Sequence, residues 1–287
     1  MNEQVISIII PAYNEEQVIK ETLLPLLPGV EDGIVEVIVV CNGCVDATAH
    51  VVKGISSKII CLETDVPSKT NALNLGDEVA SGFPRIYQDA DVVVSLDSIR
   101  KIAEVLRLGT FYAASPEMKM SYQNASWAVR SYYEIWQMLP YVSEGMIGTG
   151  VFALSEEGRS RFDKFPDVIA DDGFVRASFT SKERVSVKGA YSTVRAPLDL
   201  TSLLKIKTRS RLGRYELSTR FPELLTNEEK KYKNAIISFI PKVHCWHKVM
   251  VYIYVNVVSR LLAKRRARRL GFSGWQRDDS SRSQSAM

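Results

Sequence analysis

Along the first third of the chain, short aliphatic runs alternate with segments in which apolar positions recur every three or four residues. The runs are rich in β-branched residues, which is typical of strands covered on both faces of a sheet. Predicted strands span residues 5–10, 35–40 and 58–62, and predicted helices span 19–27, a segment from about 47, and 69–80. This alternation predicts an α/β fold with a Rossmann-type, mostly parallel sheet flanked by helices.

Short polar side chains precede several of these helices and indicate where each begins. Asn14 and Ser68 are expected to cap the first and third helices, and Asp97 to cap a later amphipathic one. Four more elements are predicted: a strand at 111–114, an aromatic-rich helix at 125–138, a strand entered from a glycine loop at 148–154, and an alternating strand at 184–195.

The last sixty residues differ in character from the rest. Residues 235–240 and 249–258 are apolar, and neither segment reaches the roughly 20 residues that span a bilayer. The basic cluster at 264–269 leaves two interpretations open: a core helix with a solvated basic end, or an interfacial anchor on anionic lipid. The expected division is a catalytic domain at 1–220, a C-terminal helical extension at 221–272 for which the membrane surface is one of these two interpretations, and a disordered tail at 273–287.

The composition is that of a folded protein, with 287 residues, 46% of them hydrophobic and 24% charged. The net charge is +4, and the basic excess lies late in the chain. The first residues lack the basic start of a secretory signal, and four cysteines in a chain of this length do not suggest a disulfide scaffold. We therefore expect a cytoplasmic protein, with the inner face of the membrane as a possible location.

Three polar segments follow predicted strands, at 11–15, 42–46 and 89–91. Ligands of parallel sheets bind at the carboxyl ends of the strands, so these segments are expected to converge. On an extended backbone, Asp89 and Asp91 would project to the same face and offer oxygen ligands to Mg²⁺ or Mn²⁺. Lys69 opposes the dipole of its helix, which an anionic ligand would relieve, unless the side chain simply extends into water.

Two further charged segments lie later in the chain. Asp171 and Asp172 open a predicted helix, where capping by one carboxylate is the ordinary role and the second carboxylate is unexplained. Residues 205–214 carry five cations and no acid. Such a run is either a solvated basic face or a source of cations for a phosphate or a phosphorylated acceptor.

Five segments carry a resemblance to a known family: 10–15 (IPAYNE), 69–74 (KTNALN), 89–91 (DAD), 171–172 (DD) and 211–215 (RLGRY). In sequence and order they resemble the motifs of family 2 glycosyltransferases, which are inverting enzymes with a GT-A fold. The resemblance covers about residues 4–220. It departs from the family pattern at Cys41, where an acid is usual, and at Tyr215, where tryptophan is usual.

The resemblance implies a nucleotide-sugar donor, with a UDP-sugar expected, and a glycan or glycolipid acceptor of the cell envelope. Asp91 with Asp89 would hold Mg²⁺ or Mn²⁺, and Asp172, beside Asp171, would be the general base. The residues implied to hold the nucleotide are Pro11, Ala12, Tyr13, Glu15, Asn42, Lys69, Asp89, Arg211 and Arg214. The absence of Asp or Glu at Cys41 leaves the nucleobase open.

Direct displacement at an anomeric carbon needs a carboxylate base on one side of the sugar and a stabilised diphosphate on the other, which is consistent with these roles. A non-catalytic nucleotide-binding scaffold is an alternative that leaves Asp172 without a purpose. The C-x-x-C at 41–44 suggests a redox pair, and then the acidic pairs have no role. Nucleic-acid binding lacks the interleaved aromatics and fold motif that would support it.

Overall fold

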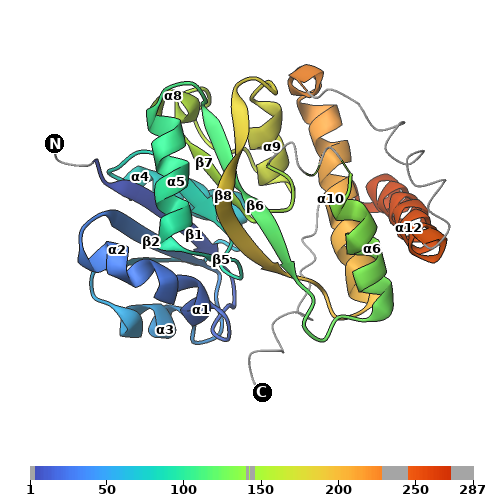
Figure 1. Ribbon diagram of the computed structural model, residues 1–287, viewed down its shortest axis with the longest axis horizontal. Helices are drawn as coiled ribbons and strands as arrows, with labels where there is room; N and C mark the ends of the chain where they lie inside the picture. Colours follow the sequence, from blue (N-terminus) through green and yellow to red (C-terminus); the bar gives the residue numbers. More distant parts are fainter. Residues whose placement is uncertain (1–3, 140–141, 143–145, 228–244, 273–287) are drawn as a thin grey trace.

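The computed structural model describes residues 4–139, 142, 146–227 and 245–272. Within them the strands form one eight-stranded sheet in the order β3-β2-β1-β4-β7-β6-β8-β5 (Figure 1). The strands are β1 (Ile6–Ala12), β2 (Val35–Asn42), β3 (Ile60–Thr64), β4 (Arg85–Gln88), β5 (Val93–Val94), β6 (Ala113–Ser121), β7 (Val151–Leu154) and β8 (Arg184–Arg195). The predicted mixed, mostly parallel α/β sheet with C-terminal helices is confirmed.

The first four strands are mutually parallel, with β1 between β2 and β4. β7 runs antiparallel to β4 and β6, β8 is parallel to β6, and β5 is antiparallel to β8. The helices are α1 (Ile19–Leu23), η1 (Leu24–Leu26), α2 (Leu27–Glu31), α3 (Thr48–Ile55), α4 (Lys69–Val79), α5 (Leu96–Arg107), α6 (Trp127–Gln137), α8 (Glu156–Arg159), α9 (Asp171–Ala177), α10 (Leu200–Arg220), η2 (Leu224–Asn227) and α12 (Trp246–Leu270).

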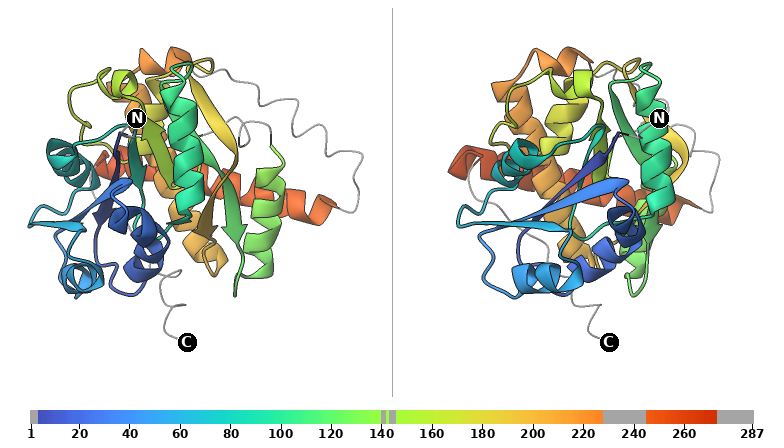
Figure 2. Two further views of the ribbon diagram at one scale, coloured as in Figure 1. Left: turned by 60° about the vertical axis from the view of Figure 1, so that its left-hand side comes forward. Right: turned by 90° about the vertical axis from the view of Figure 1, so that its left-hand side faces the viewer.

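Both faces of the sheet are covered at β1, as its run of β-branched residues predicts; all seven residues of the strand are buried. Ile8 and Ile10 pack into a core with α1, α2 and α5, whereas Ile9 packs into a second core with α4 and α9. Figure 2 shows α5 lying along one side of the sheet and α9 and α10 on the other. The strand ends between these two layers are therefore the part of the sheet that remains available to a ligand.

A third apolar cluster joins α6, α10 and α12 beyond β6 and β8 (Figure 1). α12 is one continuous helix, and its Tyr252, Val255, Ser259 and Ala263 are buried. Its other side exposes Trp246, Met250, Ile253, Tyr254, Val257, Leu261 and Leu262. Among the described helices, none has the length and apolar character needed to cross a bilayer. The predicted segment at 235–240 and the tail from 273 lie outside the described residues.

Several local predictions need correction. Asn14 does not cap a helix: α1 begins at Ile19, and the Asn14 side-chain oxygen instead accepts a hydrogen bond from Val45 N. Asp97 lies inside the first turn of α5, which Ser95 caps by accepting a hydrogen bond from Ser98 N. Ser68 caps α4 as predicted. The strand predicted at 111–114 begins later and runs further, as β6.

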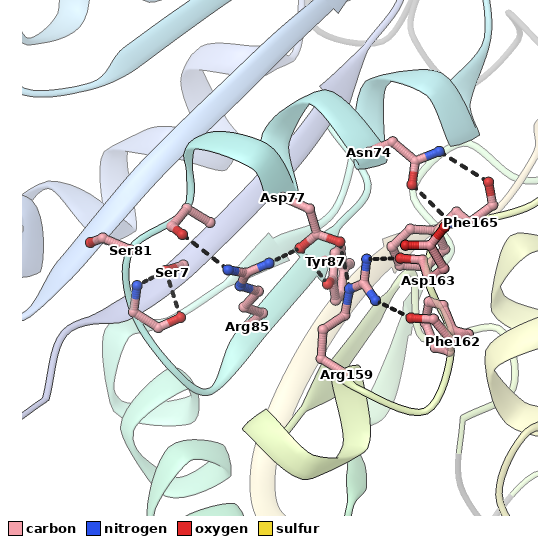
Figure 3. Close-up of polar contacts among 12 residues, drawn as sticks. Ser7, Asn74, Asp77, Ser81, Arg85, Tyr87, Arg159, Phe162, Asp163 and Phe165 are labelled. Atoms are coloured by element: carbon pink, nitrogen blue, oxygen red, sulfur yellow. Dashed lines mark hydrogen bonds and ion pairs between the residues drawn. The ribbon is translucent and has the colours of Figure 1, made fainter.

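A buried carboxylate, Asp77, holds α4 against the sheet (Figure 3). Its oxygens accept from Arg85 Nη1 at 2.7 Å, Tyr87 Oη at 2.8 Å and Arg159 Nε at 2.6 Å. These partners come from β4 and α8, so one carboxylate joins three elements. α4 begins at Lys69 and β4 ends one residue before Asp89, and the cluster therefore fixes the relative position of these two charged residues.

Replacing Asp77 with alanine is expected to destabilise the protein by about 3–5 kcal/mol, because two largely buried arginines lose their counter-charge. The measurement is the free energy of unfolding in urea. Glu78→Ala is the matched control: its ion pair with Lys164 is more than half exposed and is worth less than about 1 kcal/mol. Equal stability of the two variants would contradict the role given to Asp77.

Candidate active site

The carboxyl ends of β1, β2 and β4 lie side by side. Ala12, the last residue of β1, pairs with Cys41 of β2, and Ile9 pairs with Tyr87 of β4. If the β1–β4 pairing is extended by three residues from Ile9 and Tyr87, Ala12 lies beside the turn that follows β4. The three segments predicted to converge, at 11–15, 42–46 and 89–91, therefore lie at one edge of the sheet.

The segment after β1 is tied to the loop after β2 by hydrogen bonds. Asn14, with a left-handed φ of 53° that asparagine tolerates, accepts from Val45 N at 2.8 Å. Glu15 N donates to Thr48 Oγ1 at 2.8 Å. Of the residues implied to hold the nucleotide, Pro11, Ala12, Glu15 and Asn42 are buried here, and Tyr13 is half-buried. The two loops form a single, well-defined wall beside the strand ends.

Lys69 links the two acidic pairs. Its ammonium lies 2.7 Å from Asp89 Oδ1 and 2.9 Å from Asp171 Oδ2. The Asp171 side chain is only 6% exposed, so this pairing is screened less than a surface ion pair. The conflict between Lys69 and its helix dipole is thus relieved by protein carboxylates, rather than by extension into water. Residues 69, 89 and 171, distant in sequence, meet at one point.

The charges at this point alter the protonation of their neighbours. Desolvation opposes the charged form of Lys69, but the attraction of Asp171 and Asp89 raises its pKa above the usual value. Desolvation and the negative charge of Asp171 raise the pKa of Asp172 to about 6, against the opposing effect of Lys69. Asp172 nevertheless keeps an exposed side chain. A carboxylate with this pKa, open to solvent, can accept a proton near neutral pH.

The first acidic pair lies in a tight turn, not on the extended backbone predicted from its sequence. Val92 N donates to Asp89 O at 3.1 Å, which closes a turn over Ala90 and Asp91. Gly150, at φ +62°, supports this turn: its carbonyl accepts from Asp89 N at 2.8 Å. A Cβ on Gly150 would lie 2.5 Å from a Val92 methyl carbon, so only glycine fits.

The donor set at this turn suits a hard divalent cation. Among the described residues, no group of three or more His, Cys, Asp or Glu side chains could hold a metal ion by itself. Mg²⁺ bound with a nucleotide commonly takes only one or two carboxylates, and phosphate oxygens and water complete its shell. Asp91 and Asp89 match that requirement, with Lys69 beside them to balance additional negative charge.

The second acidic pair is positioned by α10. A Cβ on Gly213 would lie 2.7 Å from the Cβ of Ala170, so the glycine lets the helix approach the chain just before Asp171. Glu216 Oε2 accepts from Ile169 N at 2.8 Å. α9 has no side-chain cap, and Asp171 pairs with Lys69 instead of capping it. Sequence reasoning missed Gly213 and Glu216; a glycine inside a helical pattern was the one available signal.

Of the two arginines predicted near the nucleotide, Arg211 is held against α12. Arg211, on α10, donates through Nε to Ser259 Oγ at 2.9 Å and through Nη2 to Asn256 Oδ1, both on α12. Arg214, one turn further along α10, is exposed. The basic run at 205–214 thus lies on one helix, and Arg211 connects that helix to the C-terminal one.

Lys207, from the same run, lies over three aromatic rings of α6. Its ammonium is 4.5 Å from the centroid of Trp136, 4.8 Å from Tyr133 and 5.1 Å from Tyr132. Desolvation and the nearby charge of Arg211 lower the pKa of Lys207 to about 7. Within the described residues it forms no hydrogen bond or ion pair, so its amine is available to an anionic ligand, whose charge would favour the protonated form.

Replacing Lys69 with methionine is expected to raise the pKa of Asp172 by roughly one unit, because Lys69 is the cation that opposes this rise. Carboxyl ¹³C NMR titration measures the shift, with the Asp172 signal identified by its loss in Asp172→Asn. The matched control is Lys164→Met, which removes a cation from an exposed pair. An unchanged Asp172 titration in Lys69→Met would contradict the coupling.

The model of the family "Glycosyl transferase family 2" matches residues 7–150, just over half of the chain. In a comparison of the whole chain with curated proteins, none matched. Among solved structures, the mannosyltransferase PcManGT from Pyrobaculum calidifontis, in complex with GDP-Man and Mn²⁺, is similar, with 17% identity over 94% of this chain and 76% of that chain and a TM-score of 0.61.

A second similar structure is glucosyl-3-phosphoglycerate synthase from Mycobacterium tuberculosis in complex with Mn²⁺, UDP-glucose and phosphoglyceric acid. It has 19% identity over 76% of this chain and 79% of that chain, with a TM-score of 0.55. At these identities the two structures show a shared fold.

Proposed function

Because the chain belongs to glycosyl transferase family 2 and is a nucleotide-sugar glycosyltransferase, we propose that it transfers a sugar with inversion to a hydroxyl acceptor, using Mg²⁺ or Mn²⁺. One observation carries this proposal: Asp89 and Asp171, from the two acidic pairs, both contact the ammonium of Lys69 at the carboxyl edge of the sheet. A divalent cation at the first acidic pair and a base at the second would therefore both be within reach of one bound sugar.

On the donor side, Pro11, Ala12, Tyr13, Glu15 and Asn42 would hold the nucleoside against the wall formed by the first two loops. Asp91 with Asp89 would hold the metal, which when bound neutralises the departing diphosphate. Both UDP- and GDP-sugars are bound by proteins of similar fold. We favour a UDP-sugar from the family pattern, and Cys41 is the position at which the choice of base is open.

On the acceptor side, Asp172 would remove the proton of the attacking hydroxyl as the bond to the anomeric carbon forms. Its raised pKa makes it a better base than an ordinary aspartate while leaving it ionised at neutral pH. Asp171, held by Lys69, keeps its neighbour at the start of α9. The base thus depends on the arrangement of charges around Lys69.

The acceptor would approach past α10 and α6. Lys207 and the exposed Arg214 lie on α10, the helix that also supports the Asp171–Asp172 segment. Arg211 would need to leave Ser259 to contact a diphosphate or an acceptor. One protein of similar fold binds phosphoglyceric acid, an anionic acceptor. We propose a glycan or glycolipid acceptor of the cell envelope whose attacking end carries negative charge.

The exposed apolar side of α12 would rest on the cytoplasmic face of an anionic membrane. Ile253 and Val257 lie one turn apart and are about half exposed, and Lys264–Arg269 follow on the same helix. Co-sedimentation with phosphatidylserine vesicles tests this: Ile253→Asp should reduce binding, whereas Leu108→Asp, at an exposed site at the end of α5, should not. Equal binding by both variants would contradict the contact.

The alternatives drawn from the sequence gain no support. The family match favours an enzyme over a non-catalytic scaffold. The C-x-x-C at 41–44 lies within the matched residues, so the match also favours a glycosyltransferase over a protein whose main function is redox chemistry.

The test of the proposed function is nucleotide release from a panel of UDP- and GDP-sugars with Mn²⁺, with and without short glycan or glycolipid acceptors. One donor should give Mn²⁺-dependent release that an acceptor accelerates and a chelator abolishes. If folded protein neither binds nor turns over any nucleotide sugar, the proposal is wrong.

A further inference from the structure

Two cysteines, Cys41 and Cys44, lie at the nucleotide edge of the sheet, and a third, Cys61, lies on the neighbouring strand β3. Cys41 is near the end of β2, Cys44 is in the loop that follows, and Cys61 is in β3. Cys44 Sγ lies 3.3 Å from Ala12 O, and Ala12 is the residue of β1 that pairs with Cys41, so Cys44 lies against the strand position beside Cys41. Cys61 pairs with Val39 of β2, two residues before Cys41. All three are free cysteines. No step of the glycosyl transfer uses them, so their proximity needs a separate explanation.

Cys44 is part of the wall that would hold the nucleoside. Its Sγ accepts from Asn14 N at 3.4 Å, and its S–H donates to Ala12 O at 3.3 Å. It therefore bridges the segment after β1 to the loop after β2. Cys44 is half-buried, whereas Cys41 is buried. Of these two thiols, Cys44 is the one that a small solute can reach.

Cys44 is also the more acidic of the two. The hydrogen bond from Cys41 lowers the pKa of Cys44 to about 7, with help from Asn14 N and Thr48 and against desolvation and Asp46. Hydrogen bonding to its neighbours, together with burial, raises the pKa of Cys41. A half-exposed cysteine with substantial thiolate at neutral pH, beside a second thiol, has the features of an oxidation-sensitive pair.

The backbone favours one pairing over the other. In the β2–β3 register Cys61 pairs with Val39, so it is offset from Cys41 by two residues. Two residues along a strand and one strand across put those Cα atoms roughly 8 Å apart, beyond the reach of an unstrained disulfide. Cys41 and Cys44 are instead joined by Asn42 and Gly43, where φ is +64° and the chain turns.

We propose that a hydroperoxide oxidises Cys44 and that a Cys41–Cys44 disulfide then forms, weakening nucleotide binding; the second part rests on the proposed function. The Cys44 thiolate attacks the peroxide O–O bond, giving a sulfenic acid and releasing the other oxygen as an alcohol or water. The Cys41 sulfur displaces hydroxide from the sulfenic acid, so the S–S bond forms and water leaves. The peroxide is reduced, and the two thiols are oxidised.

The expected loss of affinity follows from the contacts of Cys44. A disulfide removes the S–H that donates to Ala12 O and draws Sγ toward Cys41, away from Asn14 N. The segment after β1 then loses two of its connections to the second loop. A loss on the scale of one net hydrogen bond corresponds to about tenfold weaker binding. Reduction by a thiol restores the bridge.

The experiment treats the full chain with hydrogen peroxide, then maps linkages by non-reducing peptide mass spectrometry and titrates UDP and GDP by calorimetry with Mg²⁺. Wild type and Cys61→Ser should form the 41–44 link, reversed by dithiothreitol. Cys41→Ser and Cys44→Ser should not form it. Nucleotide affinity of the oxidised wild type should fall about tenfold, whereas peroxide should not change the affinity of Cys44→Ser from the value of the same variant before treatment, because the reacting thiol is absent.

A 41–61 link, or no link, overturns the pairing. A 41–44 link without a change in affinity overturns the effect on the nucleotide. If the reduced protein binds neither nucleotide, the proposed function fails, and the linkage map still decides the disulfide separately.

Discussion

Replacing Asp172 with asparagine is expected to reduce kcat by roughly 10²–10⁴-fold while nucleotide affinity stays close to that of the wild type. Asparagine keeps the shape of the side chain but cannot accept the proton of the attacking hydroxyl. Asp171, Lys69 and Asp89 keep their mutual contacts, so the donor side is undisturbed. Kinetics under saturating donor, paired with calorimetry of nucleotide binding, separate the two effects.

The pH dependence gives a second readout of the same variant. The pKa of Asp172 is raised to about 6, so the wild-type rate should fall as pH decreases through 6, when the base becomes protonated. Asp172→Asn should lack this limb. Because the pKa of Asp172 is raised, the folded protein binds this proton more tightly than the unfolded chain does. The wild type therefore loses stability as the pH rises from the usual pKa of an aspartate to about 6. The variant should therefore be no less stable than the wild type at pH 7, and thermal melting checks this.

An Asp172→Asn variant with wild-type kcat, or with the wild-type pH profile at a reduced rate, would assign the base to another residue. A variant that has lost nucleotide binding as well would place Asp172 on the donor side.

Replacing Asp91 with alanine is expected to lower kcat/KM by about 1,000-fold, equivalent to about 4 kcal/mol of transition-state stabilisation. The physical reason is that the diphosphate leaves with its charge uncompensated. Because Lys69 is already engaged by two carboxylates, it cannot substitute for the lost cation. The measurement is the activity of the variant as a function of Mn²⁺ concentration.

The matched control is Asp97→Ala, which removes an exposed carboxylate that pairs with Lys101 on α5. It should retain wild-type Mn²⁺ dependence. If Asp91→Ala and Asp97→Ala respond to Mn²⁺ alike, Asp91 is not a metal ligand.

The strands of this fold could be predicted because their signal is local. β1 and β2 are runs rich in β-branched residues that are buried on both sides, with Ser7 and Glu36 as polar exceptions, and β8 was predicted with its observed bounds. Helix starts were predicted less well, because contacts from elsewhere in the chain decide them. The side-chain oxygen of Asn14 accepts a hydrogen bond from the backbone N–H of Val45, which lies in another loop, and so it does not cap a helix.

The candidate site could be predicted in part. The convergence of three segments follows from the parallel sheet, and the meeting of the two acidic pairs follows from the family resemblance. The charge balance at Lys69 does not follow from either, because it depends on the placement of α9, and hence on Gly213 and Glu216 of α10. The Arg211 side chain is held by Ser259 of α12. The sequence of α12 does not indicate that this helix packs against α10, so this contact could not be predicted.

The most direct test of the account is a crystal structure of the protein with Mg²⁺ and whichever of UDP and GDP binds more tightly. We predict a metal ion about 2.1 Å from a carboxylate oxygen of Asp91, with diphosphate oxygens completing its shell and the nucleoside against residues 11–15. Asp172 should face the space beyond the second phosphate. A nucleotide bound away from the ends of β1, β2 and β4, or an Asp172 turned away from the diphosphate, would contradict it.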